Sequence, residues 1–361
     1  MNSELGIITI VDNNNCGNRL QNYAVQRILS KLSISNITIQ NIAAFNDKKK
    51  CMYRKLRYFN RDFYYTYSTY LKRKNKFENF NDNINFTPKY TILSNYNFKF
   101  LLVGSDQVWN PNFGRLSDLD LLNVKCKNDT KKIAFSASFG VNELPNHLDK
   151  RKLLECFNDF DAISVREDEG KEILKDLGYK GEVSVLVDPT MLLTASEWDK
   201  VAKKPEMLKT DKYILNYFLG DLSKERMSEI QRVAKENNCE VINILDKNSP
   251  FYECGPSEFL YLEKHAFLIC TDSFHSSVFA VLYNRPFIVF DREQENVVNM
   301  NSRLDTLISK LKLENRKYNG KCITYENMNH DYTEAYKQLE IERKKSINFL
   351  KNALKENINE N

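Results

Sequence analysis

The 361 residues of this chain are enough for two domains of ordinary size. Hydrophobic residues make up 42% of the chain and charged residues 28%, which is typical of a soluble protein with a packed core. The formal net charge of +5 is too small at this length to indicate a nucleic-acid partner, and no apolar run approaches the roughly 18–20 residues of a membrane span. The eight cysteines show neither C-x-x-C nor zinc-ligand spacing, so we expect reduced thiols, a cytoplasmic location and no structural metal.

An apolar run at residues 5–11 predicts a first strand, and a helical apolar stripe at residues 20–32 predicts the helix that follows it. The loop between them is rich in Asn and Gly, which tolerate positive φ and let the backbone approach a ligand closely. Its candidate ligand-binding residues are Asn15, Gly17 and Asn18. An ordinary strand-to-helix turn is the alternative. The Gly-x-Gly-x-x-Gly fingerprint is absent, so a dinucleotide is unsupported and we expect no cofactor.

Basic and aromatic residues interleave across residues 48–80, after a second predicted strand at residues 36–42. Such a pattern fits a patch that touches a membrane surface or an anionic partner. It also fits an exposed helical insertion whose aromatic residues pack inward. We favour the helical insertion, because basic amphipathic helices are common in soluble domains. Peripheral contact with the inner face of a membrane stays open.

A third apolar run, at residues 98–103, ends in the sequence GSDQVWNP. Ser105 and Asp106 therefore follow a strand directly, where polar side chains of an α/β protein meet ligands. Trp109, a little further on, offers a flat face on which a sugar ring could stack. The next strand is predicted at residues 132–136.

The segment that follows continues the alternation of strand and helix. Arg166 stands at the carboxyl end of one strand, and a guanidinium there suits a carboxylate or a phosphate. A surface ion pair with a neighbouring glutamate is the alternative. Asp188 precedes Pro189 at the end of the next strand, a pattern typical of an Asx turn. The predicted elements are a helix at residues 148–158, a strand at 162–165, a helix at 167–177 and a strand at 183–187.

This rhythm predicts a Rossmann-like domain over residues 1–196, a linker over 197–210 and a second Rossmann-like domain over 211–325. Residues 326–361 hold a long amphipathic helix whose apolar stripe must pack on a domain surface. The strands expected in the second domain are at residues 213–219, 240–245, 266–270 and 287–290, and the helices at 222–237, 256–264 and 302–312, with one more after the third strand.

The turn after the strand at residues 266–270 carries the most informative histidine of the chain. His275 falls in the first turn of a helix, at the carboxyl end of a strand. Ligands of open α/β sheets bind at strand ends, and helix N-termini attract anions. An imidazole there can serve as an acid or a base beside a bound phosphate. A capping or packed histidine is the alternative.

Five stretches of the chain together resemble the polysaccharide pyruvyl transferase family. They are GIITIVDNNNCGNRLQNYAVQRIL, LLVGSDQVWNP, IAFSASFG, ISVREDEGKEILKDLGYKGEVSVLVDPTMLL and ICTDSFHSSVFAVLYNRPFIVF. The resemblance implies a fold similar to the two-domain GT-B glycosyltransferases, with two Rossmann-like domains facing a cleft, the first on the acceptor side and the second on the donor side. It also implies phosphoenolpyruvate as donor and a cell-surface sugar or lipid-linked glycan as acceptor.

One position departs from the family pattern. The family carries an arginine two residues before the turn histidine, and this chain has Ser273 there. Arg303, at the start of a later predicted helix, could supply the missing cation in space. The departure equally allows a different anionic donor.

Ketal formation from phosphoenolpyruvate needs cations or N–H groups for a phosphate and a carboxylate, together with an acid and a base. The candidate catalytic residues are His275 and Asp106, and the candidate donor-binding residues are Arg166, Ser273, Ser276 and Arg303. Ser105 and Trp109 join the first loop as candidates for the acceptor. A GT-B glycosyltransferase that uses a nucleotide sugar and a non-catalytic phosphosugar-binding protein are the alternative functions.

Overall fold

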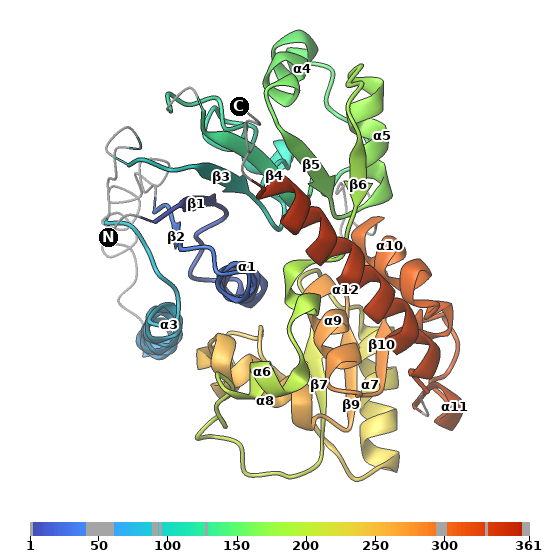
Figure 1. The fold of residues 1–361 in the computed structure, drawn as a ribbon. Helices are drawn as coiled ribbons and strands as arrows, with labels where there is room; N and C mark the ends of the chain where they lie inside the picture. The colour runs from blue at the N-terminus through green and yellow to red at the C-terminus, as the bar shows by residue number, and fades with distance from the viewer. Residues whose placement is uncertain are drawn as a thin grey trace.

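The computed structural model describes residues 3–40, 61–88, 93, 96–126, 129–293, 302–328 and 331–355. Two separate parallel sheets form the centres of two α/β domains (Figure 1). The expected fold class, two Rossmann-like domains facing a cleft, is confirmed. Within the described residues, no helix combines the length and the hydrophobicity that a membrane span requires.

The first sheet has the strand order β2-β1-β3-β4-β5-β6, and all its pairings are parallel. Its strands are β1 Leu5–Ile8, β2 Asn36–Thr38, β3 Phe100–Val103, β4 Lys131–Ala137, β5 Ala162–Val165 and β6 Val183–Val185. The helices of this part are α1 Cys16–Lys31, α3 Arg61–Asn81, α4 Lys150–Asn158 and α5 Asp168–Asp176, and α6 Ala195–Asp199 follows.

The second sheet has the order β10-β9-β7-β8, again entirely parallel. Its strands are β7 Tyr213–Tyr217, β8 Glu240–Asn243, β9 Leu268–Thr271 and β10 Phe287–Val289. Its helices are α7 Lys224–Glu236, α8 Pro256–His265, α9 Phe274–Leu282 and α10 Ser302–Leu311, followed by α11 Tyr325–Met328 and α12 Thr333–Ala353.

The two sheets share one connection pattern. In the first sheet, β2 pairs with one edge of β1, and β3 then pairs with the other edge of β1. In the second sheet, β8 and β9 pair with the two edges of β7 in the same order. A reversal of this kind leaves a crevice beyond the carboxyl ends of the two central strands, where open α/β sheets bind ligands. The first domain therefore has a binding crevice at the ends of β1 and β3, and the second domain has one at the ends of β7 and β9.

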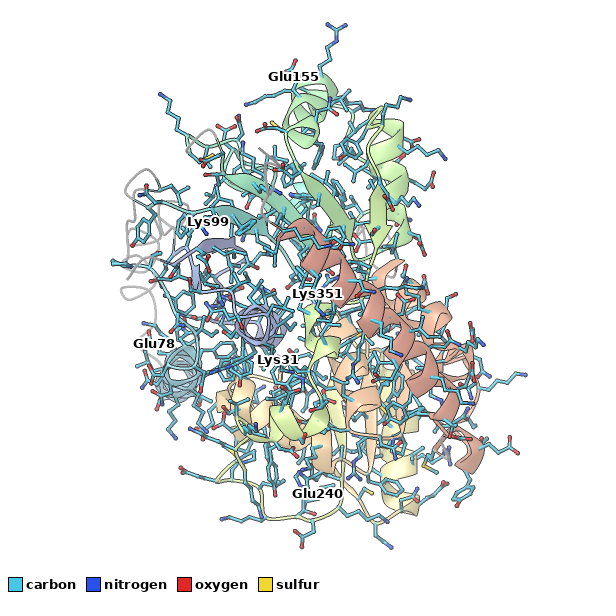
Figure 2. All side chains as sticks on the ribbon, viewed as in Figure 1. Lys31, Glu78, Lys99, Glu155, Glu240 and Lys351 are labelled. Carbon is cyan, nitrogen blue, oxygen red and sulfur yellow. The ribbon has the colours of Figure 1, made fainter. Side chains whose placement is uncertain are left out.

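Alternating residues of the strands pack into separate layers. In β3, Phe100 and Leu102 face α1, whereas Leu101 and Val103 join a second cluster with α4 and α5. The α1 layer continues without a break into α8 and α9 of the second domain, so one core cluster holds both domains together. Outward-facing positions carry charged side chains such as Glu78, Glu155 and Lys351 (Figure 2).

The C-terminal helix α12 runs across both domains (Figure 1). The Tyr336 hydroxyl donates to the Val281 carbonyl of the second domain, and Phe349 stacks on Phe135 of the first at 6.3 Å between ring centroids. Between them, Arg343 donates to the Leu193 carbonyl at 3.1 Å. The helix buries its apolar stripe against the junction of the domains.

Part of the predicted basic and aromatic insertion falls on α3. Phe77 and Phe80 are fully buried against the core, as the packed-helix interpretation requires. Tyr70 and Leu71 are exposed. Residues 48–60 lie outside the described part of the chain.

Candidate active site

The loops that follow β1, β3, β7 and β9 line one pocket of about 370 Å³. The binding crevices of the two sheets therefore open into a shared space between the domains. The first domain contributes Asp12, Gly17, Asp106 and Gln107 among others, and the second contributes Tyr217, Ser273, His275 and Arg303.

His275 occupies the first turn of α9, where the sequence pattern placed it, and only 9% of its side chain is exposed. The imidazole lies against Gly17 in the first turn of α1. A Cβ atom on Gly17 would lie 2.1 Å from His275 Nδ1, so the imidazole occupies the space that a side chain would fill. The N-termini of two helices, α1 and α9, thus converge on one side of the pocket, and both attract negative charge.

Asp188 lies directly behind His275. His275 Nε2 is 3.8 Å from Asp188 Oδ2, and Ser105 Oγ and Arg166 Nη1 are 2.9 Å and 2.7 Å from the same oxygen. Thr190 donates to the other oxygen through its N–H and its hydroxyl. Burial acts to raise the pKa of Asp188, but His275, Arg166 and Thr190 outweigh it and bring the pKa to about 2. Asp188 is therefore a carboxylate at neutral pH.

Asp106 and Arg166 extend this buried cluster. Arg166 Nη2 donates to Asp106 Oδ1 at 3.2 Å, and the Phe274 ring covers the guanidinium with 4.6 Å between the guanidinium carbon and the ring centroid. Burial raises the pKa of Asp106, whereas Arg166, His275 and Arg303 lower it, and the lowering dominates. Arg166 is bound to two carboxylates and lies behind Phe274, not at the pocket wall.

Arg303 reaches the pocket wall from the start of α10. Its Nη1 is 3.8 Å from Asp106 Oδ1, and its buried Nε has no hydrogen-bond partner among the described residues. Burial and the nearby Arg166 lower the pKa of Arg303 to about 10, so it still carries a charge at neutral pH. A guanidinium with free donors at a pocket wall suits an anionic ligand.

The protonation of His275 follows from the same surroundings. Burial lowers the pKa of the imidazole below its usual value, and Asp188 and Asp106 oppose this without reversing it. Nε2 has no hydrogen-bond partner among the described residues. In the unliganded protein the side chain is a neutral imidazole that can accept a proton.

Three sequence predictions are corrected here. Trp109 offers no surface to a sugar: its indole is fully buried, donates to the Asp120 carbonyl at 2.9 Å and packs edge-on to Phe157. The Ser276 hydroxyl is also buried and donates to Glu263 of α8 at 2.6 Å. Ser105 is buried as well, and its hydroxyl lies against Asp188. Each residue follows a strand end, but its side chain is directed into the core.

Arg166 is a further correction: predicted to bind the donor, it is buried behind Phe274 with its guanidinium paired to Asp106 and Asp188. The other candidates do meet in space. Asn15, Gly17, Asn18, Asp106, Ser273, His275 and Arg303 all line the pocket. Sequence reasoning missed the contact of Asp188 with the histidine, because it assigned Asp188 to an Asx turn alone. That turn uses one carboxylate oxygen of Asp188, and the other oxygen faces His275. Sequence reasoning also missed Gln107, which lines the pocket next to Asp106. Its position beside Asp106 after β3 was the only available signal.

No group of three or more His, Cys, Asp or Glu side chains within the described ranges is arranged to hold a metal ion. The buried charged cluster around His275 holds two carboxylates, Asp106 and Asp188, and two guanidinium groups, Arg166 and Arg303. Their charges balance, so a bound anion would depend on helix N–H groups as well as on Arg303.

Comparison with solved structures finds distant likenesses of the whole chain. UDP-GlcNAc 2-epimerase from Methanocaldococcus jannaschii is 13% identical, with a TM-score of 0.45 over 94% of this chain and 92% of that one. A functionally uncharacterized protein from Klebsiella pneumoniae subsp. pneumoniae is 10% identical, with a TM-score of 0.42 over 89% and 93%. Comparison with curated proteins finds no significant match.

The family comparison covers most of both domains and most of the pocket between them. A model described as polysaccharide pyruvyl transferase matches residues 15–294, more than half of the chain and most of the pocket loops. The matched range includes the β3 loop with Asp106, the β5 and β6 ends with Arg166 and Asp188, and the α9 turn with His275. The chain belongs to the polysaccharide pyruvyl transferase family.

Proposed function

We propose that this protein transfers a pyruvyl group from phosphoenolpyruvate to two hydroxyls of a sugar, forming a ketal on a cell-surface polysaccharide or its precursor. The observation that carries the proposal is the meeting of His275 with an anion-attracting pocket wall. Two helix N-termini and Arg303 surround the imidazole at the switch points of both sheets. Membership of the family supplies the reaction class.

The donor would bind at the start of α9. The first intrahelical bond of α9 runs from Ser277 N to the Ser273 carbonyl, so the N–H groups of Phe274, His275 and Ser276 have no partner within the helix and can donate to a ligand. Arg303 supplies a cation on the same wall and takes over the role of the arginine that Ser273 replaces. Asn18 and Gln107 add amide groups that suit the second anionic group of the donor.

The reaction has two steps that balance in atoms. In the first, a proton reaches the methylene carbon of phosphoenolpyruvate, and a sugar hydroxyl forms a bond to the neighbouring carbon while losing its own proton. In the second, a second hydroxyl bonds to that carbon as phosphate leaves. One of the two hydroxyl protons ends on the new methyl group, and the other leaves with phosphate.

His275 would move these protons. The neutral imidazole of the unliganded protein accepts a proton from the sugar hydroxyl, and a bound dianion then favours the imidazolium that returns it. Asp106 stays ionised and accepts a hydrogen bond from the attacking hydroxyl, which orients that hydroxyl. Asp188 and Arg166 lie behind and hold the imidazole and Asp106 in place.

The donor is tested by calorimetric titration of the purified protein with phosphoenolpyruvate and, separately, with a set of UDP- and GDP-sugars. We expect phosphoenolpyruvate to bind and Arg303→Ala to weaken its binding at least tenfold, since a charge-assisted contact is lost. Arg232→Ala, which removes an arginine paired on the surface with Glu229 and Glu236, should leave it unchanged. Binding of a nucleotide sugar and not of phosphoenolpyruvate would instead indicate a glycosyltransferase.

The histidine is tested by turnover. His275→Ala should lose about 100-fold or more in kcat, the usual scale for a general acid or base. His265→Ala is the matched control, because His265 is exposed at the end of α8, where its Nδ1 is hydrogen-bonded to the Tyr261 carbonyl and its ring stacks on Tyr261. Wild-type turnover in purified His275→Ala would leave His275 a packing residue and end this mechanism.

A further inference from the structure

The pocket is lined by buried charged and polar side chains at its inner end and by exposed apolar side chains at its mouth. The side chains of Asp106, His275 and Arg303 at the inner end are at least nine-tenths buried. At the mouth, Phe113 and Leu219 are 56% and 41% exposed. They are two of the six large hydrophobic residues that are exposed in the described part of the chain, and each comes from a different domain. Single exposed apolar residues are ordinary, but two at the mouth of one pocket indicate a binding surface.

Phe113 is held in place by its own loop. Pro111–Phe113 form a short 3₁₀ turn that Asn110 caps by accepting from the Asn112 N–H, and Gly114 leaves the turn at φ 65°, a left-handed conformation that suits glycine. The buried Trp109 fastens the start of this loop to the core. The aromatic ring is therefore presented to solvent at a fixed place, not left exposed by a loose segment.

Polar groups accompany the ring at the mouth. Arg115 and Asp12 line the same pocket and are half-buried, and Asn15 caps α1 beside them. Arg115 Nη1 is 3.8 Å from Asp120, which partly offsets its charge. An exposed ring with amide, carboxylate and guanidinium groups around it matches a sugar, which has apolar C–H faces and hydroxyls at its edge.

We propose that Phe113 is the stacking platform for the pyranose ring of the acceptor. The inference rests on the proposed function and adds the position of the sugar: its C–H face lies on Phe113, its edge hydroxyls meet Arg115 and Asp12, and the reacting hydroxyls point inward to Asp106 and His275. The loop after β3 thus serves the acceptor at both ends, through Asp106 at the inner end and Phe113 at the mouth. Leu219 closes the opposite side.

Saturation-transfer NMR tests this with five methyl pyranosides: the β-galactoside, β-glucoside, α-mannoside, β-N-acetylglucosaminide and β-N-acetylmannosaminide. At least one should bind the wild-type protein, with transfer strongest on the C–H protons of one ring face. Phe113→Ala and Phe113→Leu should weaken that binding about tenfold, and Phe113→Trp should keep it, since the aromatic face and not the apolar volume is required. Tyr325→Ala, which removes an aromatic residue 78% exposed on α11, is the matched control.

Two outcomes would overturn the inference: no pyranoside binds the wild-type protein, or Phe113→Ala binds as tightly as wild type. Titration with phosphoenolpyruvate on the same samples separates this from the donor. Phe113→Ala should bind phosphoenolpyruvate as wild type does, because the ring offers neither a charge nor an N–H group to an anion. Loss of sugar binding with donor binding intact supports the platform, whereas a protein that binds pyranosides on Phe113 but no phosphoenolpyruvate would keep the platform and refute the donor.

Discussion

Gly17 and His275 make a contact that no other residue at position 17 would allow. The imidazole lies where the side chain of residue 17 would begin, with Nδ1 2.1 Å from the position of a Cβ atom. The glycine was expected to let the backbone approach a ligand. The structure shows that it first lets the backbone approach the histidine, and this brings the N-terminus of α1 to the pocket.

Gly17→Ala should therefore displace the imidazole and lower kcat about 100-fold, because small misplacements of a catalytic group have effects of this size. The helix itself should tolerate alanine, which is the better helix former. Gly170→Ala in α5 is the control: its Cβ would meet Val165 Cβ at 3.2 Å and no pocket residue. Turnover of Gly17→Ala equal to that of the control would contradict the contact.

The titration of His275 gives a second prediction about a single residue. Burial lowers its pKa, so the imidazole signals followed by ¹⁵N NMR should titrate below the usual value of about 6.5 in the unliganded protein. Saturating phosphoenolpyruvate should move the midpoint upward, because a nearby dianion favours imidazolium. A midpoint at or above 6.5 without ligand, or one that falls when ligand is added, would reverse the proposed order of proton transfer.

Among the elements, α3 has a role that its composition did not reveal. Arg73 of this helix is buried and donates to the Tyr252 and Cys254 carbonyls of the second domain at 3.1 Å and 2.6 Å, and to the Asn14 carbonyl in the pocket loop at 3.1 Å. One side chain thus links the insertion, the second domain and the loop that precedes α1. The basic character of this segment is in part structural.

Arg73→Met keeps the length of the side chain and removes the three hydrogen bonds. We expect a loss of about 2–4 kcal/mol in the free energy of unfolding, measured with urea, because three carbonyls lose a charged donor. Lys74→Met, which removes an exposed ion pair with Glu78 at 3.5 Å, should change it by less than about 0.5 kcal/mol. Equal effects of the two substitutions would show that the three hydrogen bonds of Arg73 do not stabilise the fold.

At the scale of the whole molecule, the two domains share one core. The cluster beneath α1 continues into α8 and α9, and α12 packs on both domains, so neither domain buries its apolar surface alone. We expect one cooperative unfolding transition in scanning calorimetry, with equal calorimetric and van't Hoff enthalpies. Two separate transitions would show that the junction stabilises neither domain.

The sequence by itself determined the class of fold and the places where chemistry collects. Apolar runs of four to seven residues predicted every strand of both sheets within a few residues of its ends. Polar residues at the strand ends then located the site, because parallel strands of one sheet end at the same edge. Asp106 and His275 were found in this way, whereas Arg303 was named as a replacement for the arginine that the family pattern has at position 273.

Only the tertiary structure decided which side chains face the pocket. Trp109 and Phe113 belong to one loop and both are aromatic, yet Trp109 is buried and Phe113 is exposed at the mouth. Asp188 and His275, 87 positions apart in the printed sequence, lie 3.8 Å from each other. The physical reason is that periodicity depends on neighbours along the chain, whereas the direction of a loop side chain depends on how distant segments fill the space around it.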